Sequence, residues 1–352
     1  MPELEPITPR EALEMYLQDV SGDLSPNSIK AKQYQLGFFV RWCENSTKQN
    51  SLRSESSEGQ TEPRIENLNN IKGRDFTRFK NWRKEDIGNV TLKTNLSALR
   101  TFMDFCVKID AVQPNIPDKI NVPSLDQGEN RRESMMDAER AETILTYLGK
   151  FEYASFDHVL FLLQWTTGMR MSAIHSLDID DFHSDDAKLE VRHRPEQGTR
   201  LKNGPDGERF VTVSEDVVAT IDDYIEYNRI DTTDEYGREP LFSTRYGRMH
   251  KNQLNKHIYS VTRPCNVGLD CPSGKKPETC EYTGSYDSNL KCPHNTRPHD
   301  IRRGSITSFL RDDVPKVAVS DRMNVAVKTL DNHYDQRSED EKAEMRRDYF
   351  SD

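Results

Sequence analysis

Apolar residues recur at helical spacing through the first third of the chain, with polar breaks between the runs. The runs with this spacing are 8–44, which predicts two helices, 73–86 and 90–109. Thr8-Pro9 and Ser25-Pro26 mark the two starts in the first run, because each places a capping residue before a proline at the first helical position. The polar stretch at about 45–66, rich in Ser and Glu, predicts a flexible loop. Residues 1–111 therefore predict a small helical domain.

Residues 112–132 hold three prolines and show no periodicity, which predicts a linker. The remainder, 133–352, predicts a second domain. Asp137 is placed to cap a helix there, and the apolar residues of 156–176 predict a buried helical stretch.

The middle of the second domain changes to an alternating pattern. Strands are predicted at 188–192, 199–202 and 209–213, and the Gly/Pro-rich turn at 203–207 makes a hairpin. Further helices are predicted at 215–228, 250–262, 299–311, 314–321, 327–337 and 338–350. The fold class is mainly α with a small antiparallel β-sheet, and no internal repeat is visible.

The chain has 352 residues, which favours two domains because a domain averages about 150 residues. Its 49 basic and 59 acidic residues give a net charge of −10, which taken alone argues against a polyanionic partner. Basic residues nevertheless gather at 72–100 and 291–311. From these two patches the candidate DNA contacts are Lys72, Arg74, Arg78, Lys80, Arg83, Lys84, Lys93 and Arg303. A solvated helix face explains either patch equally well, and Arg303 has an ion pair with the acidic surface as its alternative.

The longest apolar run, Val159–Leu163, is far below the roughly 20 residues that a membrane span needs. The first residues show neither the basic nor the apolar region of a signal peptide. We therefore expect a cytoplasmic protein with no membrane partner.

Six cysteines divide into two kinds. Cys43 and Cys106 stand alone in helical patterns and are expected to be small core residues. The others lie in the Pro/Gly/Asn-rich insert 263–295, and they are Cys265, Cys271, Cys280 and Cys292. Such a cluster in a reducing compartment favours structural zinc, with His294 able to replace one sulfur. Because the spacing lacks paired CxxC motifs, free thiols and disulfides stay open as alternatives.

Residues able to act on a phosphodiester follow one another through the second domain. Arg170 ends the motif Thr167-Gly168-Met169-Arg170, Lys202 precedes the hairpin turn, and His299 and Arg302 stand three apart on one helix face. Tyr334 lies in His333-Tyr334-Asp335. Arg170 to Lys202 and Arg302 to Tyr334 are both 32 residues apart. This order resembles the tyrosine recombinase (phage integrase) family, and its motifs look most like the integrases of halophilic archaea.

The resemblance covers nearly the whole chain and implies a helical core-binding (SAM-like) DNA-binding domain followed by a mixed α+β catalytic domain. It implies a site-specific recombinase that cuts and rejoins double-stranded DNA, acting as a homotetramer on paired sites. No cofactor and no small-molecule substrate are needed for this reaction.

Each implied role suits the side chain. A tyrosine is both a nucleophile and a fair leaving group, so Tyr334 would form a 3′-phosphotyrosyl intermediate. Arg170 and Arg302 would stabilise charge on the phosphate oxygens, Lys202 would protonate the leaving 5′-oxygen, and His299 would accept a proton or bind phosphate. Tyr349 is the rival nucleophile but lacks the same setting.

Two departures from the family pattern matter. The pocket position about nine or ten residues before the tyrosine falls on Asn324 or Val325, and Asn324 can donate a hydrogen bond but cannot carry charge. Ala173 stands where many relatives have a glutamate that braces the first arginine. The alternatives are therefore a decayed integrase that only binds DNA as a regulator, or a type IB topoisomerase-like enzyme.

Overall fold

The structure is a computed structural model that describes residues 4–45, 63–126, 134–284 and 288–334, with 340, 343, 344 and 347 beyond them. The chain divides into two compact units, Met1–Asn130 and Arg131–Asp352. The predicted fold class is confirmed: both units are mainly helical, and small antiparallel sheets lie in the second. The helix predicted at 338–350 lies largely outside the described residues.

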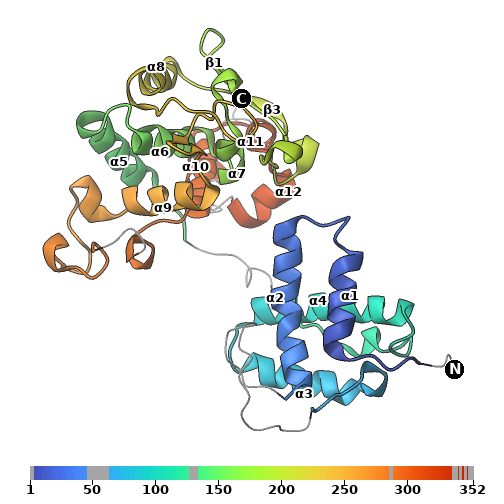
Figure 1. Cartoon of the computed structure of the whole chain (residues 1–352). Helices are drawn as coiled ribbons and strands as arrows, with labels where there is room; N and C mark the ends of the chain where they lie inside the picture. Colours follow the sequence, from blue (N-terminus) through green and yellow to red (C-terminus); the bar gives the residue numbers. More distant parts are fainter. Residues whose placement is uncertain are drawn as a thin grey trace. The chain divides into compact units, whose positions relative to one another are not determined.

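Among its described residues, the first unit is a bundle of four helices. They are α1 (Pro9–Asp19), α2 (Pro26–Cys43), α3 (Gly73–Lys84) and α4 (Asn89–Lys108). In Figure 1, α1 and α2 run side by side across α4. The predicted caps are confirmed, since the side chains of Thr8 and Ser25 accept hydrogen bonds from the backbone of Glu11 and Ser28.

Parts of the predicted loop and linker pack into this bundle instead. Ile65, in the predicted loop, joins the bundle core, whereas 46–62 lie outside the described residues. Val112, Ile116 and Ile120 are buried in the same core, and a 3₁₀ turn at Pro117–Lys119 lies between the last two. The prediction of a linker beginning at 112 is therefore wrong, because its apolar residues are buried without following any regular period.

The second unit is built around helix α10 (Pro298–Arg311), which Figure 1 shows amid the other helices. The helices of this unit are α5 (Ala138–Phe151), α6 (Phe156–Thr167), α7 (Met171–Ser176), α8 (Glu215–Asp223), α9 (Lys251–Val261), α10, α11 (Lys316–Met323) and α12 (Val327–Thr329). Single π-helical turns follow α8 at Tyr224–Asn228 and α12 at Leu330–Tyr334. The predicted cap is confirmed, since Asp137 accepts a 2.7 Å hydrogen bond from the backbone of Arg140.

The main sheet has three strands in the order β1-β2-β3, and all pairs are antiparallel. The strands are β1 (Phe182–His183), β2 (Lys188–Val191) and β3 (Arg209–Thr212), and a second sheet pairs β4 (Ser243–Thr244) with β5 (Gly247–Arg248). The predicted strand at 199–202 is wrong: the chain there makes one isolated bridge, between Thr199 and Arg194, and the rest is a turn. Gly198, with φ +75°, reverses the chain just before it.

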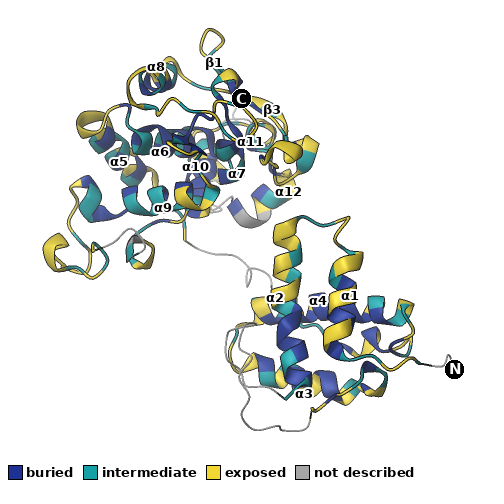
Figure 2. Ribbon diagram, in the orientation of Figure 1, coloured by how far each residue is buried: buried dark blue, intermediate teal, exposed yellow. Residues whose placement is uncertain are grey.

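Helix α10 is buried on most of its surface, as its dark colour in Figure 2 shows. Gly304 lets α10 lie directly against the segment that leads into α5, because a Cβ there would come within 2.0 Å of the Met136 carbonyl oxygen. Within the described residues, no helix is long and apolar enough to cross a membrane.

Candidate active site

A glycine turn between α6 and α7 positions Arg170. Gly168 ends α6 in the left-handed conformation with φ +58°, which glycine adopts without strain. The chain then turns, and Arg170 becomes the N-cap of α7. A side chain at Gly168 would come within 2.6 Å of the Met323 methyl group, so the turn also lets α11 approach closely.

Arg302 projects from α10 into the same region and is 1% exposed. Its Nη1 donates to the Gly168 carbonyl at 2.5 Å and its Nη2 to the Met323 carbonyl at 2.8 Å. Its Nε is buried without a hydrogen-bond partner among the described residues. The Arg302 guanidinium thus joins the turn at Gly168 to the end of α11, and its Nε–H remains available as a hydrogen-bond donor.

His299 and Tyr334 meet beside Arg302. The Tyr334 hydroxyl lies 3.4 Å from His299 Nε2, and the two rings pack edge to face with centroids 5.9 Å apart. Tyr334 is anchored at the end of the π turn, where its carbonyl accepts a 2.9 Å bond from the Thr307 hydroxyl of α10. It is buried in a small apolar cluster with residues of α10 and α11.

A pocket on the surface collects the remaining predicted residues. Arg170, Lys202 and Asn324 line it together with Arg209, which begins β3. Lys202 is exposed in the connection between β2 and β3. The structure therefore brings Arg170, Lys202 and Asn324 together. Beside them, Arg302 and Tyr334 are buried, and His299, which contacts Tyr334, is exposed.

Asn324 binds protein groups with both ends of its side chain. Its side-chain Oδ1 accepts from Asn203 Nδ2 at 2.6 Å, and its backbone carbonyl oxygen accepts from Arg170 Nη1 at 2.7 Å. Its Nδ2 donates to the Asp206 carbonyl at 2.7 Å. Asn324 thus joins Arg170 to the loop bearing Lys202, whereas Val325 is buried in the apolar cluster.

Cations crowd this site and depress one another's pKa. Burial, and then Arg170, lowers the pKa of Arg302 to about 10, although Tyr334 partly offsets this. Burial, and then Arg302 and Arg170, likewise lowers the pKa of Arg209 to about 10. Both stay charged at neutral pH, so the site concentrates positive charge that a bound anion would relieve.

Arg209 is the residue that the sequence interpretation missed. Its Nε donates to the Arg322 carbonyl at 2.7 Å and its Nη1 to the Gly207 carbonyl at 2.8 Å, so it is held beside the pocket. No local motif surrounds it. The available signal was its position at the exit of the hairpin that carries Lys202.

The candidate general base is neutral under ordinary conditions. Burial, followed by the charges of Arg303, Arg302 and Arg170, lowers the pKa of His299 below its usual 6.5. A neutral imidazole with Nε2 beside a phenol can accept the phenolic proton.

The predicted DNA contacts of the two units differ in how exposed their side chains are. Lys72, Arg74, Arg78 and Lys84 are exposed, and Lys80 and Lys93 are half-buried. Arg83 and Arg303 are wrong as surface contacts, because both are buried. The Arg83 guanidinium stacks 3.5 Å from the centroid of the Phe38 ring, and Arg303 donates to the Ser134 carbonyl at 3.3 Å.

A groove between α2 and α4 adds residues that the sequence interpretation did not single out. Lys32 and Gln35 line it from α2, and Thr94, Ser97 and Thr101 line it from α4, together with the predicted Lys93. Short polar and basic side chains of this kind suit a phosphate backbone.

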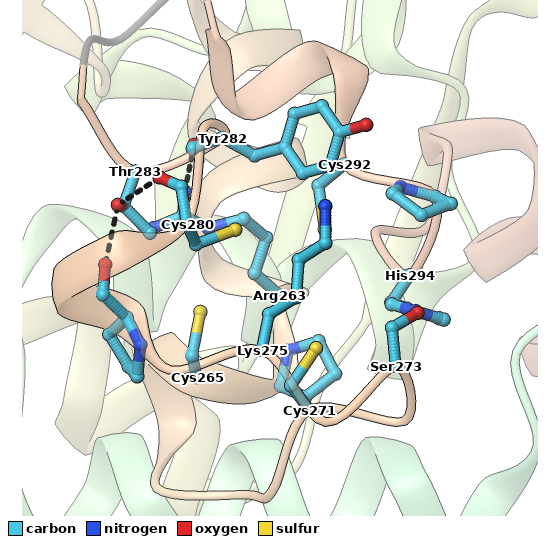
Figure 3. Close-up of a pocket in the computed structure, with 13 residues that line it drawn as sticks. Arg263, Cys265, Cys271, Ser273, Lys275, Cys280, Tyr282, Thr283, Cys292 and His294 are labelled. Carbon is cyan, nitrogen blue, oxygen red and sulfur yellow. Dashed lines mark hydrogen bonds between the residues drawn. The ribbon is translucent and has the colours of Figure 1, made fainter.

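The four cysteines of the insert surround a separate pocket, which Figure 3 shows. Cys265, Cys271, Cys280, Cys292 and His294 all line it, and no disulfide joins any of the chain's six cysteines. Burial raises the pKa of the Cys265 thiol, and Cys292 and Cys280 raise it further. Among the described residues, no three histidine, cysteine or carboxylate side chains are already grouped as metal ligands.

Comparison with known proteins identifies the family. The model of the phage integrase family matches residues 134–340, more than half of the chain. The chain therefore belongs to the phage integrase family, as the order of its motifs predicted. No curated protein matches it in sequence.

Solved structures share the fold at low identity. The Tn1549 transposon integrase in complex with transposon right end DNA matches at a TM-score of 0.65 and 15% identity, over 97% of this chain and 100% of that one. A lambda integrase tetramer bound to a Holliday junction matches at 0.60 and 11% identity, over 94% of this chain and 80% of that one. These matches support the fold and neither of the two alternatives.

The predicted branch of the family stays a prediction. The N-terminal domain of a phage integrase/site-specific recombinase from Haloarcula marismortui is 26% identical over 34% of this chain and 99% of its own. Its TM-score is 0.28, so this match carries no argument.

Proposed function

We propose that this protein is a site-specific tyrosine recombinase that cuts and rejoins double-stranded DNA through a 3′-phosphotyrosyl intermediate. The observation that carries the proposal is the pair of Tyr334 and His299, with 3.4 Å between Oη and Nε2, beside the arginines of a cation-rich site. Membership of the phage integrase family supports the same chemistry.

The first step forms the covalent bond. Tyr334 Oη attacks the scissile phosphorus while its proton passes to His299 Nε2, which is neutral because burial and nearby arginines lower its pKa. The bond between phosphorus and the 5′-oxygen then breaks, and the 3′-phosphate stays on the tyrosine. Rejoining is the reverse, with a 5′-hydroxyl as the attacking group.

Three arginines stabilise the charge that develops on the non-bridging oxygens. Arg302 offers its buried Nε, which has no hydrogen-bond partner among the described residues. Arg170 lies close enough to lower the pKa of Arg302, and Arg302 lies close enough to lower the pKa of Arg209. Guanidinium groups stay charged throughout and bind phosphate through paired donors. We therefore add Arg209 to the predicted phosphate ligands.

Lys202 is the proposed general acid. It is exposed on the loop between β2 and β3, and it shares a pocket with Arg170 and Asn324. From there its ammonium group gives a proton to the leaving 5′-oxygen. Asn324 fixes that loop through Asn203 and Asp206, so it acts by positioning Lys202 and Arg170.

The first unit is proposed to grip the DNA backbone through its exposed basic residues and through the groove between α2 and α4. Strand exchange needs two sites, and we propose a homotetramer on paired sites, a state that the lambda integrase structure on a Holliday junction illustrates for that protein. The proposal requires no metal or other cofactor in the reaction itself.

Covalent trapping tests the proposal directly. Wild-type protein and the Tyr334→Phe variant are incubated with nicked duplexes tiled across the DNA that flanks the gene, over a range of KCl because phosphate contacts weaken with salt. On denaturing gels we expect a protein–DNA adduct for the wild type and for the control Tyr349→Phe. We expect no adduct for Tyr334→Phe. Specific DNA binding without any adduct would contradict the proposal and indicate a regulator.

A further inference from the structure

The insert between α9 and α10 has little apolar core to hold it. Its described residues, 263–284 and 288–295, contain three 3₁₀ turns, at Pro264–Val267, Pro277–Thr279 and Ser288–Lys291. Among those residues, Val267 alone joins the hydrophobic core of the unit, while Leu269 and Leu290 are exposed. Burial of apolar surface therefore does little to fix this segment, and another source of order is needed.

We propose that the insert binds one Zn²⁺ through the thiolates of Cys265, Cys271, Cys280 and Cys292. These cysteines belong to separate parts of the insert, yet all four line one pocket. In Figure 3 the sulfurs of Cys265, Cys271 and Cys280 point into the space that the labelled side chains surround. Four thiolates in a tetrahedron are a common structural zinc site, and such a site orders a segment without a core.

The charge around the pocket fits the same ion. Zinc with four thiolates carries a net charge of about −2, because each thiol loses its proton on binding. Arg263 and Lys275 line the pocket and offset this charge. Lys275 is held beside the pocket by an ion pair with Glu281 at 2.7 Å.

The side chains must close around the ion, since no ready-made group of three ligands exists in the described residues. Zinc to sulfur distances are about 2.3 Å, so the four thiols have to move inward from the pocket wall. The backbone hydrogen bonds of the described insert join residues only three to five positions apart, so these bonds do not fix one turn against another. Metal binding is therefore coupled to ordering of the insert.

Ordering the insert would fix the entry to the helix that bears His299 and Arg302. Arg140 Nη2 of α5 donates to the carbonyls of Thr262 and His294, both at 2.6 Å, so it joins the two ends of the insert. Thr296 N also donates to the Thr262 hydroxyl at 2.9 Å. Because α10 begins at Pro298, a zinc ion at these cysteines would hold the first turn of that helix in place.

Metal content of the full-length protein tests the proposal without DNA, so its result is independent of the recombinase proposal. Protein purified without chelators is analysed by plasma mass spectrometry, and we expect about one zinc ion per chain. Replacement by Co²⁺ should give the visible absorption of tetrahedral cobalt with sulfur-to-metal charge transfer. After chelation, hydrogen exchange should rise in the insert and at the start of α10.

Substitutions define the ligands. Cys280→Ser and Cys292→Ser should each lose most of the zinc, whereas the control Cys106→Ala, in the core of the first unit, should keep it. His294→Gln should keep it as well, because the His294 Nε2 bonds to the Ser273 hydroxyl at 2.6 Å. If the cysteine variants fail to fold, the wild-type metal content and the cobalt spectrum still decide the question.

Four outcomes would overturn the proposal. The first is wild-type protein without metal and with free thiols, and the second is an intact mass that shows two disulfides within the insert. The third is zinc that persists in both cysteine variants, which would mark adventitious binding. Loss of zinc in His294→Gln would overturn the ligand set of four cysteines.

Discussion

Arg170 and Arg302 show why the identity of each residue matters more here than the overall charge of −10. They come from the start of α7 and the first half of α10, and each interacts electrostatically with Tyr334. Neither arginine can be replaced by a basic residue elsewhere on the surface, because backbone carbonyls hold each guanidinium in a fixed position. A charge in a fixed position stabilises a transition state without reorganisation.

Replacing Arg170 should therefore affect chemistry more than binding. For Arg170→Ala we expect the single-turnover cleavage rate to fall by about 10²–10³-fold, the cost of losing one such donor, while DNA affinity changes little. Cleavage of a nicked duplex and a gel-shift titration measure the two quantities. The exposed Arg245→Ala serves as control and should change neither. An equal loss of affinity and rate would contradict the role.

The lowered pKa of His299 makes a prediction about pH. Only the neutral imidazole accepts a proton, so activity is lost as pH falls through the pKa of His299. Because burial and then Arg303 and Arg302 depress that pKa, the acid limb of kcat/KM, which reports the free enzyme, should lie below 6.5. In His299→Gln the rate should drop by about 10²-fold or more, and this limb should vanish. An acid limb at or above 6.5 would remove His299 from the role of base.

Sequence reasoning succeeded at this scale where several motifs agreed and failed where a single property was used. The order of Arg170, Lys202, His299, Arg302 and Tyr334 predicted the family that the comparison found. Counting basic residues failed for Arg83 and Arg303, because a count does not show which face of a helix is buried. Arg209 belongs to no local motif, so only the fold places it beside the pocket.

Helix α10 connects the two parts of the site at the scale of elements. It bears His299 and Arg302 near its start, and it supports Tyr334 through Thr307 one turn further on. Its position depends on Gly304, whose missing side chain makes room for the Met136 carbonyl. Geometry at the site therefore depends on a residue that touches no reacting group.

Two helical glycines should respond to the same substitution with opposite signs. Gly304→Ala would bring Cβ to 2.0 Å from the Met136 carbonyl oxygen and 3.0 Å from the Trp165 ring, so backbone must move. We expect a loss of about 3 kcal/mol or more in the free energy of unfolding. Gly149→Ala, at an exposed position of α5, meets only His158 at 4.0 Å and should gain about 0.5–1 kcal/mol from helix propensity.

Urea unfolding of the two variants, followed by circular dichroism, measures both effects. The comparison is informative because both glycines lie inside helices of the same unit. Equal stability of Gly304→Ala and the wild type would show that α10 can move away from the segment before α5 without cost.

Elements with clear caps and periods could be predicted from sequence, and short ones could not. The helices of the first unit begin where Thr8-Pro9 and Ser25-Pro26 indicated. Strands β1, β4 and β5 contain two residues each, too few for any alternation to be visible. The predicted strand at 199–202 was wrong. The alternating pattern there comes from two buried residues, Thr199 and Leu201, in a segment that forms no strand.

At the scale of the whole molecule, each unit has a hydrophobic core of its own. The length of the chain suggested two domains, and the predicted linker at 112–132 contains the border, although the first part of that linker belongs to the first unit. Val112, Ile116 and Ile120 pack into the first unit without periodicity, and the division falls at Asn130 and Arg131. The prolines of this segment indicate an irregular backbone, but an irregular segment can still pack into a hydrophobic core.

The complete set of proposed reacting groups belongs to a single chain. Tyr334 contacts His299 of its own second unit and interacts with its own Arg170 and Arg302. If this arrangement persists in the assembly on DNA, each protomer cuts the strand bound to its own arginines. Cleavage in cis is therefore the expected mode.

Mixing two defective proteins tests this expectation. Tyr334→Phe lacks the nucleophile, and Arg170→Ala lacks a phosphate ligand. In a mixed assembly that cuts in cis, every site keeps one defect, so cleavage should not exceed that of Arg170→Ala alone. Cleavage in trans would build an intact site from the tyrosine of one protomer and the arginine of the next, and the rate would then rise well above either variant. Co-purification of differently tagged variants on the same DNA provides the control for mixing, because only mixed assemblies make an absence of rescue informative.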